Sequence, residues 1–144
     1  MAIYPTAEQI QTLMGGPADR PVVMLNLLRF KPRADAPDDG VSGEEAYRRY
    51  AAAMRTFVES KGCRFLWIGR VDSQVIGTGG EGFHMAGLVE YPSRQAFVAI
   101  ATDPHVEEIA VHRTAGLESQ WLIALTTEAS EAPRSGAGDD GPSR

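Results

Sequence analysis

The stretch Val22-Val23-Met24-Leu25-Asn26-Leu27-Leu28-Arg29-Phe30 decides the fold, because it is the most apolar run in the chain. Aliphatic residues follow one another almost without interruption, which is typical of a β-strand that is covered on both faces. Successive side chains of a strand point to opposite faces, so Asn26 shares a face with Met24 and Leu28, whereas Leu25 and Leu27 lie on the other. The pattern predicts a central strand with two apolar faces and one polar residue, Asn26, that needs a hydrogen-bond partner or a wet cavity.

Helical patterns flank this strand on both sides. A short helix is predicted over 6–14, where Gly15-Gly16-Pro17 ends it. Ser42-Gly43-Glu44-Glu45 has the pattern of a capping box, in which Ser42 accepts from a backbone N–H and Glu45 reaches back to the cap. A long amphipathic helix should follow and end at Lys61-Gly62. Two more helices are predicted: one starts at Pro92-Ser93, and the next follows the cap residue Asp103 with Pro104 at its first position.

Three further strands are predicted, over 65–76, 84–91 and 119–126. The resulting order is strand, helix, strand, strand, helix pair, strand, which is the split βαββαβ or ferredoxin-like arrangement of an α+β protein. Right-handed crossovers place both long helices on one face of a four-stranded antiparallel sheet. The other face would remain bare and apolar, which is unusual for a monomer, so we expect a homodimer that packs sheet on sheet.

Length and composition limit the organisation and the partners. A chain of 144 residues is expected to form one domain, over 21–127, with an N-terminal helical extension at 1–20 and a disordered tail at 128–144. The formal net charge is −5 and basic residues form no stripe, so neither a nucleic acid nor a membrane is expected as a partner. The N-terminal residues do not resemble a signal peptide, and the single cysteine, Cys63, fits a reducing compartment, so we expect a cytoplasmic protein.

Four stretches together resemble a known family. They are Pro21 to Phe30, Gly43-Glu44-Glu45-Ala46-Tyr47-Arg48-Arg49-Tyr50, Glu90-Tyr91-Pro92-Ser93-Arg94 and Asp103-Pro104. In this order they are similar to the family catalogued as domain of unknown function 1330. The resemblance implies the dimeric α/β-barrel superfamily, which includes cofactor-free monooxygenases, lactone isomerases, dehydratases and haem-binding relatives. It also implies a site between the concave face of the sheet and the helices of one subunit.

Two apparent motifs do not carry the chemistry that their letters suggest. Gly77-Thr78-Gly79-Gly80-Glu81-Gly82 matches a dinucleotide fingerprint, but it joins two antiparallel strands and opens no helix, so a hairpin link is the better interpretation. His105 and His112 are separated by about two helical turns, roughly 10 Å, which is too far to share a metal ion. We therefore expect neither a metal nor a cofactor.

A better candidate site consists of polar residues that lie among aromatic ones. His84 and His112 are the candidate proton acceptors, because neutral imidazole suits that role. Arg113 ends an apolar helical stripe, where its partner would be either Glu90 or the acid group of a ligand. Asn26 is interpreted equally well as tied to a neighbour or as a ligand contact. The candidate substrate-binding residues are Asn26, Tyr47, Tyr50, Trp67, Arg70 and Arg113.

Two functions are consistent with these residues. The first is a cofactor-independent enzyme, similar to a monooxygenase or an isomerase, that acts on a small oxygenated molecule; Asn26 and Tyr47 would stabilise the oxyanion and Arg113 would anchor the substrate. The second is a protein that only binds or sequesters such a molecule. A pocket in which a histidine lies within hydrogen-bond reach of Asn26, Tyr47 or Arg113 would favour the enzyme.

Overall fold

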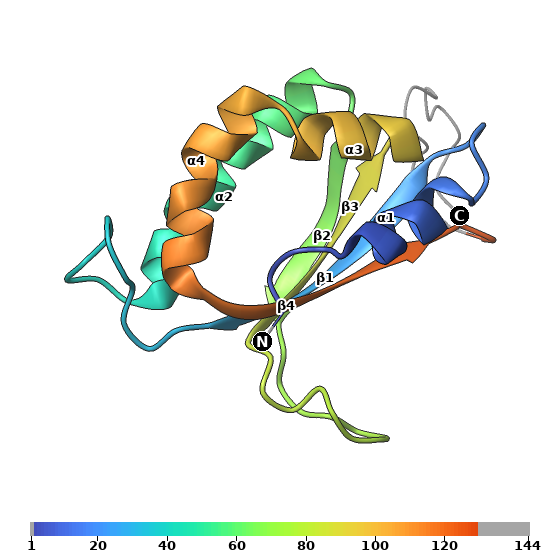
Figure 1. Cartoon of the computed structure of the whole chain (residues 1–144). Coiled ribbons are helices and arrows are strands. Elements are labelled where there is room, and N and C mark those ends of the chain that lie inside the picture. The colour runs from blue at the N-terminus through green and yellow to red at the C-terminus, as the bar shows by residue number, and fades with distance from the viewer. Residues whose placement is uncertain (1, 130–144) are drawn as a thin grey trace, which may run out of the picture.

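The computed structural model describes residues 2–129 and contains one antiparallel sheet with a layer of helices on one face (Figure 1). The strands are β1 (Val22–Phe30), β2 (Arg64–Arg70), β3 (Met85–Tyr91) and β4 (Leu117–Leu125). The helices are α1 (Ala7–Met14), α2 (Gly43–Ser60), α3 (Arg94–Ala101) and α4 (Pro104–Gly116). The strand order β2-β3-β1-β4 is that of the ferredoxin-like α+β fold, which confirms the predicted fold class.

Strand β1 lies between β3 and β4 and has two different environments. Val22, Met24 and Leu28 are at most 4% exposed and belong to the core beneath the helices. Leu25 and Leu27 point to the opposite face, where no element of the described chain covers them completely. The sequence predicted two apolar faces for this strand, and the structure shows which of them the helices cover.

Helices α2 and α4 pack closely against each other in the helix layer that covers one face of the sheet. Gly43 and Gly116 lie at the contact, and a Cβ atom on either glycine would overlap the carbonyl oxygen of the other. Ala46 and Ala115 are buried beside them, so the two helix backbones approach closely. Because Gly43 is the first residue of α2, this contact also fixes the position of the helix start relative to β1.

The helix caps follow the sequence with one exception. Ser42 Oγ accepts a hydrogen bond from the Glu45 N–H at 3.1 Å, and Gly62 takes the left-handed conformation (φ 89°) after α2. Among the described residues, however, the Glu45 side chain makes no bond back to the Ser42 N–H, so only half of the predicted capping box forms. Thr6 and Gln9 form both halves of such a box at the start of α1.

The second strand is shorter than predicted. It ends at Arg70 instead of continuing to residue 76, and the sequence between Arg70 and Met85 is an irregular link. Val75 and Ile76 are 87% and 89% exposed, although their side chains favour strands. The ladder between the edge strand β2 and β3 ends at Arg70 and Met85, and one further hydrogen bond runs from the Val71 N–H to the His84 carbonyl at 3.0 Å. Val75 and Ile76 have no strand partner in the described chain.

In the part of the chain that the structure describes, no helix combines sufficient length with sufficient hydropathy to cross a bilayer.

Candidate functional site

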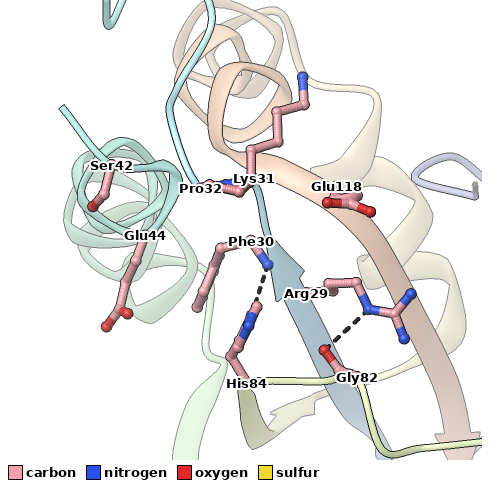
Figure 2. A pocket seen from close by; sticks show the side chains of 9 residues that line it. All are labelled: Arg29, Phe30, Lys31, Pro32, Ser42, Glu44, Gly82, His84 and Glu118. Carbon is pink, nitrogen blue, oxygen red and sulfur yellow. Dashed lines mark hydrogen bonds between the residues drawn. The ribbon is translucent and has the colours of Figure 1, made fainter. Parts of the chain in front are cut away.

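An open groove of about 560 Å³ lies where β1 ends and α2 begins. Figure 2 shows the rings of Phe30 and His84 side by side in its wall, with the cap residue Ser42 and Glu44 of α2 on one side and Glu118 of β4 on the other. The groove therefore lies between the sheet and the start of a helix. Its lining residues are Arg29, Phe30, Lys31, Pro32, Ser42, Glu44, Gly82, His84 and Glu118.

His84 has a fixed orientation in this groove. Its Nδ1 accepts a hydrogen bond from the backbone N–H of Phe30 at 3.0 Å, and its ring is nearly parallel to the Phe30 ring, with 5.7 Å between centroids and 4° between planes. A backbone N–H can only donate, so Nδ1 carries the lone pair and the ring proton resides on Nε2. In this tautomer Nε2 of His84 can only donate, because the lone pair that a proton acceptor needs is already engaged at Nδ1.

A row of aromatic rings leads from the groove to the interior. Phe30 packs against Tyr47, and Tyr47 packs against Tyr50, with 5.4 Å between ring centroids in each pair. Neither tyrosine hydroxyl has a hydrogen-bond partner among the described residues. Every fully buried polar side-chain atom in that part of the chain does have a partner, so these two hydroxyls are not fully buried and retain contact with solvent. Burial raises the pKa of both tyrosines above the ordinary value, which keeps the hydroxyls protonated as donors.

The charged side chains of the groove are mostly paired. Arg29 donates from Nε to the carbonyl of Gly82 at 3.0 Å, and Glu44 accepts from Arg48 and Arg70. Burial by itself raises the pKa of Glu44, but the two arginines outweigh this effect and hold the pKa below its usual value. Arg70, a predicted ligand contact, therefore reaches the edge of the groove through its ion pair with Glu44.

Asn26 is satisfied by protein groups. Its Oδ1 accepts from Gln120 Nε2 at 2.8 Å, and its Nδ2 donates to the carbonyl of Met24 at 3.3 Å. Gln120 Oε1 in turn accepts from Arg113 at 2.8 Å, and the same guanidinium donates to the carbonyl of Ile3. The structure thus brings two predicted site residues, Asn26 and Arg113, into one network, with Gln120 as the bridge.

The predicted alternative partner of Arg113, Glu90, lies elsewhere. Glu90 accepts from Arg64 at 3.1 Å on the neighbouring strand β2. The two residues are opposite each other in the ladder between β2 and β3, on the face of the sheet away from α4. Arg113 approaches from the helix side and therefore cannot share this carboxylate.

His112 acquires a partner that the sequence did not suggest. Its Nδ1 lies 2.7 Å from Asp38 Oδ2, and Arg49 donates to the other carboxylate oxygen. Asp38 is only 2% exposed, whereas the His112 side chain is 33% exposed. The hydrogen bond from His112 is the main reason why the pKa of Asp38 is lowered, with Arg49 adding to the effect and burial opposing it. Asp38 belongs to the loop between β1 and α2, so the pair links this loop to α4, and neither residue lines the groove.

The remaining candidate, Trp67, lies on the open face of the sheet. It is 54% exposed, and its cross-strand partner Leu88 is paired in turn with Leu25 of β1. Cross-strand partners share a face, so Trp67 points away from the helices and from the groove. Of the two predicted histidines, only His84 lines the groove, and neither is hydrogen-bonded to Asn26, Tyr47 or Arg113 in the described chain.

Sheet order, helix layer and site position together define a protein of the ferredoxin-like α+β class. The chain belongs to the family described as domain of unknown function (DUF1330), whose model matches residues 40–126. It is similar to a protein of unknown function from Rhodopseudomonas palustris, with 34% identity and a TM-score of 0.80 over 89% of this chain and 98% of that one. A methylated form of that protein gives 33% identity and a TM-score of 0.80, over 91% and 98% of the two chains.

A more distant similarity concerns the fold alone. A Dabb family protein with a ferredoxin-like fold from Mesorhizobium loti is 13% identical, with a TM-score of 0.51 over 76% of this chain and 99% of that one. No curated protein matches the chain.

Proposed function

We propose that this protein binds a small, planar, oxygenated organic molecule in the groove at the end of β1, and that it does so as a homodimer. The observation that carries the ligand proposal is the fixed ring of His84, which is held by the Phe30 N–H and lies parallel to the Phe30 ring. The bond to Nδ1 leaves Nε2–H without a partner among the described residues, at a wall of the groove. A donor on an aromatic wall is suited to a flat ligand with an acceptor oxygen at its edge.

The charges around the groove favour a ligand without high charge. Arg29 and Lys31 contribute two cations to the lining, and Glu44 and Glu118 contribute two anions. Glu44 is already paired with two arginines, so it offers little attraction to a cationic ligand. Aromatic acids, quinones and lactones combine a flat apolar body with acceptor oxygens and are the classes that we expect.

A thermal-shift screen tests the groove. Benzoate, menadione and γ-butyrolactone serve as probes of the three classes, and a bound probe raises the unfolding temperature according to its affinity. We expect the shift to disappear in His84→Ala and to persist in the control His105→Ala, because His105 packs on Phe57 and does not line the groove. The imidazole nitrogen signals of His84, and not those of His105, should move on titration. Absence of a shift with all three probes, or an equal shift in His84→Ala, would exclude ligand binding by this residue.

The homodimer proposal rests on the uncovered face of the sheet. Trp121, Ile123 and Leu125 of β4 are 47%, 42% and 38% exposed. Their partners on β1 include Leu25 and Leu27, so these side chains form one apolar surface on the side away from the helices. A surface of this kind is typical of a subunit interface, and two copies of one chain would bury it by twofold symmetry.

Sedimentation equilibrium at micromolar concentration tests the dimer. Ile123→Asp should give a monomer, because the charge would be buried without a partner between the two sheets. Val75→Asp is the matched control, since Val75 is 87% exposed on the irregular link and lies outside the sheet. A wild-type protein that sediments as a monomer would refute the dimer.

Asp38 and His112 favour a second function, an enzyme without a cofactor. Asp38 accepts from Nδ1–H of His112, which places the lone pair of the neutral ring on Nε2, the atom that would accept a proton from a substrate. Nε2 of His112 has no hydrogen-bond partner among the described residues. Since every fully buried polar side-chain atom there has a partner, Nε2 is not fully buried and is in contact with solvent. The chemistry of such a pair is removal of a weakly acidic proton from an oxygenated carbon compound.

Proton NMR in heavy water distinguishes catalysis from binding alone. γ-Butyrolactone has exchangeable protons next to its carbonyl, and a competent base accelerates their replacement by deuterium. We expect exchange above the buffer rate in the wild type and a loss of that excess in His112→Gln and Asp38→Asn. His105→Gln, a second histidine on α4, should leave the rate unchanged. Exchange at the buffer rate in the wild type would refute base catalysis on this class of substrate.

A further inference from the structure

The segment Ala2–Tyr4 lies along the open edge between β4 and α4. The carbonyl of Ala2 accepts from the Gln120 N–H of β4 at 2.9 Å, and the Tyr4 hydroxyl is 2.8 Å from Thr114 Oγ1 of α4. Between these two contacts, the carbonyl of Ile3 accepts from the guanidinium of Arg113. Figure 1 shows this dark-blue segment passing over β4 before α1 begins.

The side chain of Ile3 enters the apolar interior. It packs against the buried cluster of Leu28, Phe30 and Leu117, together with Tyr47. Ile3 therefore presents two chemical features to the protein: a branched aliphatic group toward this cluster and an oxygen acceptor toward Arg113. A small branched or cyclic carboxylate presents the same two features.

Arg113 is poorly matched by its present partners. In the part of the chain that the structure describes, its guanidinium has two neutral oxygens, those of Ile3 and Gln120, and forms no ion pair. It also lies over the ring of Tyr4, with 5.2 Å from Cζ to the ring centroid. A carboxylate is a stronger acceptor for a guanidinium than a neutral carbonyl, because the hydrogen bonds are charge-assisted and can form in pairs.

The segment that fills this position is held by three hydrogen bonds and by the partly buried Ile3 side chain. It belongs to no helix or strand, and Tyr4 is 61% exposed. Segments with few buried apolar contacts open locally at a small free-energy cost. A ligand that binds only the open form selects that form, and its apparent affinity then depends on how often the segment is displaced.

We propose that Ile3 occupies a second binding site within its own chain, and that the ligand of this site is a small carboxylate with a branched or cyclic apolar body anchored by Arg113. The carboxylate replaces the carbonyl of Ile3 at the guanidinium, and the apolar body replaces the Ile3 side chain against the cluster of Leu28, Phe30 and Leu117. The site differs from the groove proposed above in its anchor, because Arg113 does not line that groove, although Phe30 borders both.

Isothermal titration calorimetry with isovalerate tests this site in the full chain. Ile3→Gly removes the side chain that holds the segment in place, so isovalerate should bind about tenfold more tightly than to the wild type, which corresponds to about 1.4 kcal/mol. Ile76→Gly is the matched control, because Ile76 is 89% exposed and the same substitution there should leave the affinity unchanged. Isovaleramide, the uncharged isostere, should gain no such affinity.

Two more variants keep the result interpretable. Tyr4→Phe removes only the hydroxyl contact with Thr114 and should tighten isovalerate binding about two- to fivefold without disturbing the core. Arg113→Gln in the Ile3→Gly background should abolish the gain, whereas His84→Ala should preserve it. Equal affinity in the wild type, Ile3→Gly and Tyr4→Phe would overturn the proposal, and so would a gain that survives Arg113→Gln. Failure of the groove probes would not affect this outcome.

Discussion

Asp38→Asn measures how much the contacts of Asp38 with Arg49 and His112 contribute to the free energy of unfolding. In the folded protein the carboxylate is 2% exposed and accepts charged or chargeable donors from Arg49 and His112. Hydrogen bonds to a charged group contribute about 1.5 to 3 kcal/mol each. Two effects offset part of this contribution. The side chains of Arg49 and His112 are 45% and 33% exposed, so in the variant they can form hydrogen bonds with water instead. The variant also no longer buries a charge. We expect a net loss of about 2 kcal/mol in the free energy of unfolding.

Urea unfolding followed by circular dichroism at neutral pH gives this value, and the thermal midpoint should fall by about 8 °C for a chain of this size. Asp35→Asn is the control in the same loop. Asp35 is 66% exposed and pairs with Lys31 at the surface, so its loss should cost at most about 0.5 kcal/mol.

The pH dependence gives the sign of the effect. The folded pKa of Asp38 lies below the unfolded one, so its contribution is complete above about pH 4 and declines as the pH falls through the folded value. The difference between wild type and Asp38→Asn should therefore be constant from neutral pH to about pH 4 and shrink below it. An Asp38→Asn variant as stable as Asp35→Asn, or a difference that grows at low pH, would refute the reasoning.

Three further predictions concern the core and the aromatic row. Gly116→Ala should lower the free energy of unfolding by about 2 to 3 kcal/mol in urea titration, because its Cβ would overlap the Gly43 carbonyl; unchanged stability would contradict the close helix contact. Cys63 is 4% exposed and burial raises its pKa to about 11, so Ellman's reagent should react slowly with the native protein and rapidly in denaturant. Rapid reaction of native protein would show that the thiol is accessible. Tyr47→Phe should change stability by less than about 0.5 kcal/mol, since the hydroxyl has no partner in the described chain; a loss of about 2 kcal/mol would reveal one.

Much of the fold was predictable because its signals are local. The alternation of Trp121, Ile123 and Leu125 and the apolar run of β1 specify strands from neighbouring residues alone. The caps are equally local: Ser93 accepts from the Ala96 N–H at 3.0 Å, and Asp103 accepts from the His105 N–H at 2.8 Å. Such signals need only the four residues around a helix start, so sequence was sufficient.

The end of β2 and the partners of the site residues depend on distant residues. Val75 and Ile76 have strand propensity, but a strand also needs a partner, and β3 begins too late to provide one. Asn26 was recognised as a residue in need of a partner, yet that partner, Gln120, is 94 positions away. Arg64 satisfies Glu90 because the ladder places it directly opposite, which no periodicity reveals.

Sequence reasoning missed Asp38, the partner of His112 in the proposed catalytic pair. It lies in a stretch rich in proline, aspartate and glycine, whose composition is typical of a solvent-exposed connector. Its burial arises only when α2 and α4 bring Arg49 and His112 beneath the loop. The available signal was weak: one acidic residue in a loop next to a helix pair with a histidine and an arginine.

Helix α4 passes into β4 without a loop, since Gly116 ends the helix and Leu117 begins the strand. The junction is also clamped, because the Gly116 carbonyl accepts from the Lys31 N–H at 2.8 Å. The orientation of α4 relative to β4 is therefore set directly by the backbone at Gly116 and Leu117. A single residue inserted at this point would rotate α4 by about 100° relative to β4, or exchange the two faces of β4. Chain length has more freedom near the exposed residues Val75 and Ile76 of the link between β2 and β3, but at this junction it sets the direction of both Arg113 and Trp121.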